Sequence, residues 1–349
     1  MKSRRRQRVS TFSLTFEAKE DGMSQTRVQW LSLAVVMFLG LFLAQAQAAD
    51  KPKDYPVKPV TIQLGFGAGG SSDVGVRVLA DALKKVIGQP VLVENKPGAG
   101  GQVLWTDFKN NAKPDGYTLA LVNIPQLQTI VFDPVRKSLF TMKDFQPVAN
   151  HVQDPGAILV RKESPYKTLE DFLSDAKARP GQVKCSTTGI GSDDHLAVLD
   201  VQRKTNLRFN IIHLQDTPSA LTQVLGGHTD VNFDNVGGFL PAVKSGTARV
   251  LAVMMEQRFP DLPNVPTFKE RGIDLVSSST RGYVFPAGTP QEIVRYMEQS
   301  IKKAMDDPDH IKRMTDAGLT LKFMGVDEFS KFLEGQNERA KQLIGMYRK

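Results

Sequence analysis

Short apolar runs alternate with amphipathic stretches from residue 60 onward. Val60–Phe66 is apolar and has the length of a buried strand. Apolar residues then recur at every fourth position, at Val74, Val78, Ala82 and Val86. This spacing predicts a helix with one buried face that ends at Gly88. Val91–Val93 is apolar again. The pattern therefore predicts a β-α-β unit.

The same alternation returns in the middle of the chain. Strands are predicted at 183–187, 211–213, 231–234 and 250–253, and helices at 195–205 and 218–225. The last segment is helical, at 292–305, 308–317 and 327–344. Alternating elements of this kind predict an α/β fold with parallel or mixed sheets flanked by helices. Two lobes joined by crossing strands are expected, lobe 1 from 49–155 plus 283–349 and lobe 2 from 156–282.

The N-terminus predicts export. Leu31–Ala44 is apolar but too short to cross a bilayer comfortably, which is typical of a signal-peptide core. Ala46 and Ala48 supply the small residues of a cleavage site, so residues 1–48 are predicted to be a signal peptide and the mature protein to be periplasmic. Met23 is an alternative translation start, because the lead-in before the apolar core is unusually long.

Charge and cysteine content narrow the function further. The formal charge is +8, but residues 1–48 carry net +4 of it, so the 301 residues that follow carry only +4. No basic stripe stands out among them, so nucleic-acid binding is not expected. Cys185 is the only cysteine, which excludes an intrachain disulfide, and it is predicted to be a buried strand residue.

Most catalytic and metal-binding motifs are absent from the sequence, and no catalytic residue, metal or cofactor is predicted. The exception is Gly65–Gly70, which fits the dinucleotide pattern G-x-G-x-x-G, with Glu94 where a ribose-binding acid belongs. An NAD(P)-dependent oxidoreductase is therefore the alternative. Asp73 in the first helical turn opposes a pyrophosphate there. The glycines also suit a carboxylate held by free N–H groups at the helix start.

A series of short blocks, in order, resembles a known family. They are Tyr55-Pro-x-Lys-Pro59, Phe66-x-x-Gly-Gly-x-x-Asp73, Gly88-Gln-Pro-Val-x-Val-Glu-Asn95, Pro97-Gly-Ala-Gly-Gly101, Asp115-Gly-Tyr-Thr118, Gly189-x-Gly-Ser-x-x-His195, Leu225-Gly-Gly227, Phe233-Asp-Asn235, Arg249-x-Leu-Ala-Val253, Leu262-Pro-x-Val-Pro-Thr267 and Pro286-Ala-Gly-Thr-Pro290. From about Tyr55 to Lys341 the chain resembles the Bug-type solute-binding proteins of tripartite tricarboxylate transporters.

That resemblance implies a two-lobed, type II-like "Venus flytrap" fold of a periplasmic binding protein, with no catalysis. It implies a monomer that captures a small carboxylate between its lobes and delivers it to membrane permease subunits. The ligand would lie against the loops at 66–73 and 189–195. The ligand-binding residues predicted in this way are Phe66, Gly69, Gly70, Ser71, Asp73, Asn123, Gly189, Ser192, Asp194, His195, Asp216 and Asp234.

Two acids depart from the family's usual pattern. Asp194 replaces a small hydroxyl residue, and Asp216 lies in a segment that replaces a Tyr-Lys-Gly type sequence. If both face the cleft, they favour a ligand that carries a positive or hydrogen-donating group besides its carboxylate, such as an amino acid or a heterocyclic acid. Whether the closed form serves a permease or a signalling partner is left open by the sequence.

Overall fold

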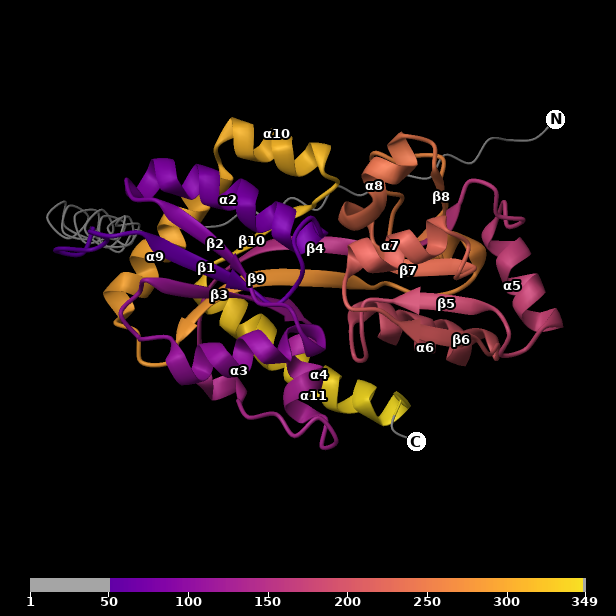
Figure 1. Ribbon diagram of the computed structural model, residues 1–349, viewed down its shortest axis with the longest axis horizontal. Helices are drawn as coiled ribbons and strands as arrows, with labels where there is room; N and C mark the ends of the chain where they lie inside the picture. Colours follow the sequence, from indigo (N-terminus) through magenta and orange to yellow (C-terminus); the bar gives the residue numbers. More distant parts are fainter. Residues whose placement is uncertain (1–50, 348–349) are drawn as a thin grey trace, which may run out of the picture. The chain divides into compact units, whose positions relative to one another are not determined.

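The computed structural model describes residues 51–347 (Figure 1). The predicted signal peptide at 1–48 and the alternative start at Met23 lie outside the described residues. Residues Ala49–Lys349 group as one compact unit, and its helices and strands are named as in Figure 1. Over the described range, every helix falls short of the length and apolarity that a membrane span requires.

Ten strands and ten α-helices make up the described residues. The strands are β1 (Val60–Leu64), β2 (Val91–Asn95), β3 (Thr118–Ile124), β4 (Phe145–Arg161), β5 (Lys184–Thr187), β6 (Asn210–His213), β7 (Val231–Asn235), β8 (Ala248–Val253), β9 (Ser278–Pro286) and β10 (Leu321–Met324). The helices are α2 (Ser71–Ile87), α3 (Gln102–Asn111), α4 (Gln126–Phe132), α5 (Leu169–Ala178), α6 (Asp193–Thr205), α7 (Thr217–Leu225), α8 (Val236–Lys244), α9 (Gln291–Met305), α10 (Pro308–Asp316) and α11 (Val326–Tyr347).

The strands form one mixed sheet in the order β2-β1-β3-β9-β4-β7-β5-β6, with β8 and β10 also paired to β4. The pairs β1–β2, β1–β3, β5–β6 and β5–β7 are parallel, whereas β9 runs antiparallel to β3 and β4. We call the part built on β1–β3 and β10 the A side, and the part built on β5–β8 the B side. Strand β4 belongs to both, because Phe145–Pro155 pairs with β9 and Gly156–Arg161 with β7 or β8. The predicted α/β sheet flanked by helices is confirmed.

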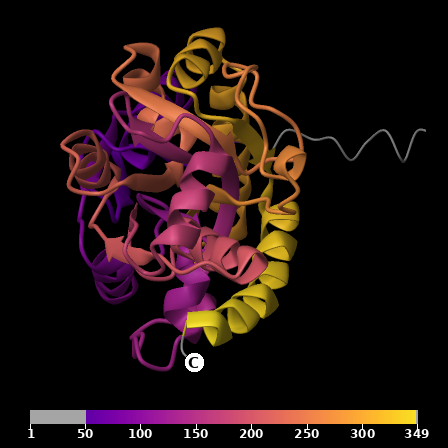
Figure 2. The same ribbon diagram turned by 90° about the vertical axis from the view of Figure 1, so that its right-hand side faces the viewer.

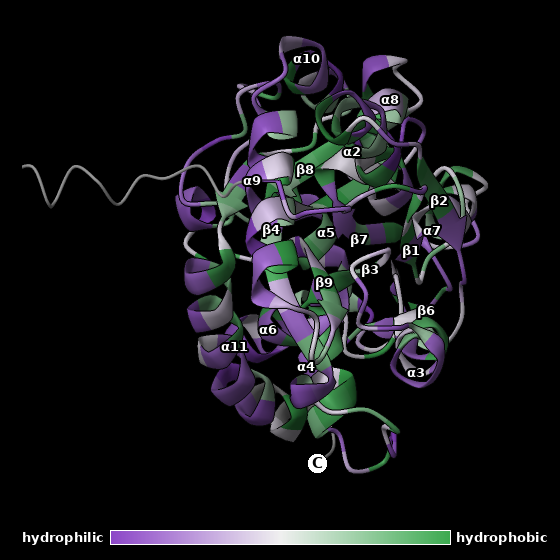
Figure 3. Cartoon of the chain, turned by 90° about the vertical axis from the view of Figure 1, so that its left-hand side faces the viewer, coloured by the Kyte–Doolittle hydropathy of each residue, from purple (hydrophilic) through white to green (hydrophobic). Residues whose placement is uncertain are grey.

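Each side has its own apolar interior. On the A side, α2 and α9 pack against β1 and β3, with Leu64, Leu79, Leu83 and Met297 fully or almost fully buried. The helix predicted before Gly88 is confirmed, since Gly88 ends α2 in the left-handed conformation. Its buried face is wider than predicted, because β1 and α9 also cover Val76, Leu79 and Leu83. Figure 3 shows hydrophobic residues gathered on the inner strands and hydrophilic ones along the outward sides of α10 and α11.

Cys185 lies in the middle of the B-side interior. Its side chain is fully buried in β5 among the apolar residues of that core, as the sequence predicts. Burial raises the pKa of its thiol well above the usual value. A thiol that stays protonated and shielded from solvent is a poor nucleophile, so Cys185 is a packing residue.

Candidate functional site

The loop between β1 and α2 is held in place by Asp73. The Gly69 N–H donates to Asp73 Oδ2 at 2.9 Å, and the Arg77 and Asn95 side chains donate to the same carboxylate at 3.0 and 2.9 Å. The hydrogen bonds from Arg77, Gly69 and Asn95 outweigh burial and lower the pKa of Asp73. The Gly69 N–H and the Asp73 carboxylate are therefore hydrogen-bonded to each other, and neither residue lines the cavity described next.

The start of α2 is open to a ligand. Gly70 precedes the helix without any side-chain cap, so the first N–H groups of α2 receive no such partner. Gly70 and Ser71 also line a small cavity between the A and B sides. A helix N-terminus with uncapped N–H groups favours an anion.

This cavity, called here the cleft cavity, measures about 30 Å³. Of the predicted ligand-binding residues, it is lined by Phe66, Gly70, Ser71, Asn123 and Asp216. The lining residues that sequence reasoning did not assign to the site are Gly67, Ser72, Ile124, Gln126, Thr188, Asp193, Thr217, Asn235, Ser279 and Arg281. The predicted residues Gly69, Asp73, Gly189, Ser192, Asp194, His195 and Asp234 lie outside this lining.

Arg281 is the basic residue of the cleft cavity. Only 3% of Arg281 is exposed, and its Nη2 lies 3.1 Å from Asn235 Oδ1 and 2.9 Å from Asp154 Oδ2. Its Nε and Nη1 have no hydrogen-bond partner among the described residues. Burying unsatisfied N–H groups of a guanidinium is costly, so these two atoms are suited to an anionic ligand. Sequence reasoning did not assign Arg281 to the site; the signal available was a single charged residue directly before the apolar end of β9.

Two amides next to the α2 terminus also have unsatisfied atoms. Asn123 Nδ2 donates to Ser72 Oγ at 3.1 Å, while Asn123 Oδ1 has no partner among the described residues. Gln126 Nε2, at the start of α4, likewise has none, although only 4% of this residue is exposed. The A side of the cleft cavity thus presents one acceptor and one donor beside the uncapped helix start.

The loop between β5 and α6 differs because its polar groups bond to one another. Ser192 Oγ caps α6 by accepting from His195 N–H at 3.1 Å, and it donates to Gly189 O at 2.9 Å. His195 Nδ1 accepts from Gly191 N–H at 3.0 Å. Asp194 accepts a hydrogen bond from the Thr188 hydroxyl group. These contacts hold the loop itself, and the cleft cavity is reached instead by Thr188 and Asp193.

Three buried carboxyl groups on the B side interact electrostatically, and one of them, Asp193, also lines the cleft cavity. Burial is the main cause that raises the pKa of Asp193 to about 6 and of Asp234 to about 7, and it raises the pKa of Asp194 as well. Repulsion from neighbouring acids adds to the shifts, from Asp193 and Asp234 on Asp194, from Asp193 on Asp234, and from Asp154 on Asp193. Asn235 bridges Asp193 to the cleft arginine, since its Nδ2 donates to Asp193 Oδ2 at 2.7 Å and its Oδ1 accepts from Arg281.

Asp216 places an acid at the opposite wall from the α2 terminus. It caps α7, because its Oδ1 accepts from the N–H and the hydroxyl of Ser219 at 3.0 and 2.6 Å. Its Oδ2 faces the A side so closely that a Cβ added to Gly67 would lie 2.6 Å from it. The A and B sides also touch where Thr129 Oγ1 donates to Gly191 O at 2.8 Å. The cleft is therefore closed in this structure.

The residues of the dinucleotide alternative have packing roles. A Cβ on Gly65 would lie 2.6 Å from Gly101 Cα, so this glycine permits the close approach of two backbone segments. Glu94 accepts from Gln63 Nε2 at 2.7 Å and does not line the cleft cavity. Across residues 51–347, no cluster of three His, Cys, Asp or Glu side chains is placed to hold a metal ion.

Comparison with known proteins identifies the family. The model of the tripartite tricarboxylate transporter family receptor matches residues 76–347. A protein encoded in the gbd 5′ region of Cupriavidus necator is 34% identical over 317 residues, which cover 89% of this chain and 93% of that protein. The protein BugT of Bordetella pertussis is 30% identical, over 91% of this chain and 96% of BugT.

Solved structures match as well. MatC from Rhodopseudomonas palustris with bound malate superposes with a TM-score of 0.77 at 26% identity, over 83% of this chain and 100% of MatC. The periplasmic binding protein BugD gives a TM-score of 0.76 at 26% identity, over 83% of this chain and 98% of BugD. These matches confirm the two-lobed periplasmic-binding-protein fold. They also overturn the oxidoreductase alternative, since the family consists of solute-binding receptors and not of enzymes. The chain belongs to the tripartite tricarboxylate transporter receptor family.

Proposed function

We propose that this receptor captures a small carboxylate-bearing solute in the periplasm and delivers it to the membrane permease subunits of a tripartite transporter. The observation that carries the proposal is Arg281, a buried guanidinium with two unsatisfied N–H-bearing nitrogens at the cleft cavity. The malate bound to MatC, a relative of the same fold, is consistent with a carboxylate ligand. Export through a signal peptide at 1–48 and a monomeric state are part of the proposal.

One carboxylate of the ligand is expected at Arg281 and the α2 terminus. The free Nε and Nη1 of Arg281 lie on either side of the occupied Nη2, so each can donate one charge-assisted hydrogen bond to an anionic ligand. The uncapped N–H groups after Gly70 and the Gln126 Nε2 donor supply the remaining bonds. The carboxylate would thereby accept from Arg281 Nε and Nη1 and from Gln126 Nε2, which have no partner among the described residues.

The far end of the ligand meets acids. Asp216 Oδ2 faces the A side across the cavity, and Asp193 shares the lining. A second carboxylate placed there would be repelled, whereas an ammonium or ring N–H group would donate to Asp216. We therefore infer an amphoteric ligand, such as an amino acid or a heterocyclic acid, in preference to a plain di- or tricarboxylate.

Entry requires the cleft to open. A cavity of about 30 Å³ is far below the roughly 300 Å³ at which small-molecule pockets begin. We propose that lobe 1 (49–155 plus 283–349) and lobe 2 (156–282) separate by bending where the chain crosses between the A and B sides. The ligand then favours the closed form through contacts that exist only when both walls meet it.

The test is titration calorimetry of the native protein with amino acids, pyridine carboxylates and dicarboxylates, followed by two variants. Arg281→Gln removes the charge-assisted hydrogen bonds from Nε and Nη1, and because each contributes about 1.5–3 kcal/mol, affinity should fall about 100-fold or more. The double variant Arg281→Gln/Asp154→Asn avoids leaving Asp154 buried without its ion-pair partner. Arg249→Gln, a strand arginine that bonds backbone carbonyls away from the cleft cavity, is the matched control.

Asp216→Asn separates the ligand classes. Asparagine still caps a helix, so α7 should remain intact. Affinity for an amphoteric ligand should fall by about 1.5–3 kcal/mol, while dicarboxylates should bind no worse. A native preference for a plain dicarboxylate, with Asp216→Asn unchanged, would refute the amphoteric assignment. Normal affinity in the Arg281 double variant would refute the carboxylate site itself.

A further inference from the structure

A second cavity lies on the other face of β9. Ser279 and Arg281 line the cleft cavity, whereas their neighbours Ser278 and Thr280 line a separate cavity of about 190 Å³. Successive side chains of a strand point to opposite faces, so one strand forms a wall of both cavities. We call this second space the rear cavity.

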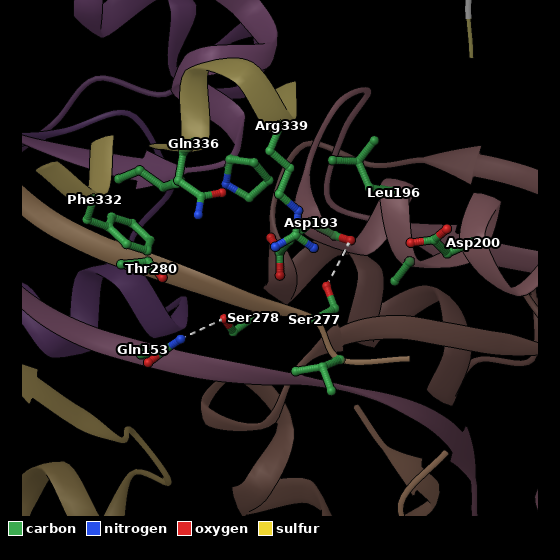
Figure 4. A pocket seen from close by; sticks show the side chains of 14 residues that line it. Gln153, Asp193, Leu196, Asp200, Ser277, Ser278, Thr280, Phe332, Gln336 and Arg339 are labelled. Carbon is green, nitrogen blue, oxygen red and sulfur yellow. Dashed lines mark hydrogen bonds between the residues drawn. The ribbon is translucent and has the colours of Figure 1, made fainter. Parts of the chain in front are cut away.

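Two helices form walls of the rear cavity: α6, on the B side, and α11, at the C-terminal end of the chain. Leu196, Ala197 and Asp200 come from α6, and Phe332, Gln336 and Arg339 come from α11. Figure 2 shows α11, the long yellow helix, running beside the B-side elements, and contacts between α11 and α6 agree with this view. In Figure 4, Arg339 extends from α11 toward Asp193 of α6, with Phe332 and Gln336 along the same helix.

The size and the apolar part of the lining suit a compact ring or a branched chain. An apolar cavity of about 150 Å³ is known to hold benzene, and the rear cavity is slightly larger. Its apolar side chains come from several elements and leave a surface on which such a group can rest. They are Ile124, Pro125, Leu196, Ala197, Val276 and Phe332.

The charges of the lining point to an anionic substituent. Both acids already have partners, because Asp193 accepts from Asn235 at 2.7 Å and Asp200 is paired with Arg203 at 2.9 Å. Arg339, the one basic residue in the lining, makes no hydrogen bond or ion pair with any described residue. Arg339 is therefore the charged residue of this lining that lacks a counter-ion among the described residues, which favours an anionic group on the ligand.

We propose that the rear cavity is a second binding site, for a small carboxylic acid with a compact apolar body. Its carboxylate would pair with Arg339 at the mouth, and its body would rest on Phe332 and Leu196. Ser277, Ser278 and Gln336 offer hydrogen bonds to a hydroxyl substituent. The anchoring residues Arg339, Phe332 and Leu196 do not line the cleft cavity, although Ile124 and Asp193 line both cavities.

The test uses 4-fluorobenzoate as the probe and fluorine NMR as the readout. The Arg281→Gln/Asp154→Asn variant serves as the starting protein, so that binding in the cleft cavity does not contribute. For a probe of this size, a Kd below about 10 mM is expected. Arg339→Gln in that background should weaken binding at least about tenfold, the effect of one lost charged contact. Lys331→Gln, an exposed α11 residue that does not line the cavity, is the matched control.

A steric variant makes the test independent of charge. Gln336→Trp fills the rear cavity from the half-buried face of α11 and should abolish probe binding with little change in melting temperature. The proposal is overturned if the probe does not bind the starting protein. It is equally overturned if binding survives both Arg339→Gln and Gln336→Trp. Neither result bears on Arg281 or on the cleft ligand.

Discussion

The two glycine-rich loops that follow β1 and β5 are similar in sequence but present different groups to the cleft cavity. The first presents N–H donors and the second a carboxyl group. Both lead into a helix through glycines, a serine and an aspartate. In the first, Asp73 turns back to hold Gly69 and leaves the α2 terminus uncapped. In the second, Ser192 caps α6, and the residue that reaches the cavity is Asp193. One loop offers donors and the other an acid, so a ligand that spans them needs a different group at each end.

The largest expected effect comes from removing the acid that holds the first loop. Asp73→Ala deletes hydrogen bonds to Gly69, Arg77 and Asn95, and the Asp73 side chain is only 4% exposed. We expect the free energy of unfolding to fall by about 3 kcal/mol. Urea denaturation measures this loss. Asp200→Ala, which breaks an exposed pair with Arg203, should cost under about 1 kcal/mol, and equal losses would contradict the special role of Asp73.

The second loop should respond to pH with the opposite sign. The folded-state pKa of Asp193 is raised to about 6 from 3.8, so its contribution to stability is complete below about pH 4 and is lost as pH rises through 6. The pKa of Asp73 is lowered, so its contribution is present above about pH 4 and is lost on acidification. In thermal unfolding from pH 4 to pH 8, the melting temperature of Asp193→Asn should therefore rise relative to that of the native protein as pH increases. If the melting temperatures of the variant and the native protein change with pH in parallel, Asp193 does not have the raised pKa.

The smallest effect concerns the two serines at the helix starts. Ser192→Ala removes the cap of α6 and should cost about 1 kcal/mol. Ser71→Ala removes no cap, so its effect on unfolding should stay within about 0.5 kcal/mol. Its effect should appear in ligand affinity instead, because Ser71 lines the cleft cavity. If Ser71→Ala destabilises as much as Ser192→Ala, the contrast between the loops is wrong.

The sequence predicted local structure better than it predicted the site. Periodicity and glycine placed α2 and its end at Gly88, because these signals are carried by neighbouring residues. The choice between Asp193 and Asp194 was missed for a geometric reason: consecutive residues at a helix start point about 100° apart, so one faces the cavity and the other turns behind it. Asp194 was predicted from its place in the family motif, without considering the direction in which its side chain leaves the helix.

Arg281 was missed because its setting depends on distant residues. Its neighbours Asp154 and Asn235 are far from it in sequence, and only the pairing of β4 with β7 and β9 brings them together. For Gly69, in contrast, neighbouring residues in the sequence carried a usable signal. The Asp73–Arg77 pair at four-residue spacing could have indicated that Asp73 is occupied, and with it the N–H of Gly69.

The buried Cys185 makes the chain a convenient base for an optical reporter. It is the single thiol of the sequence, and inside β5 it is shielded from maleimide reagents. New cysteines at exposed positions would therefore take up dye without background from the native residue. Val103 on the A side and Ile190 on the B side are 51% and 41% exposed, respectively. A donor and an acceptor dye at these two positions would convert each opening of the cleft into a change in energy transfer.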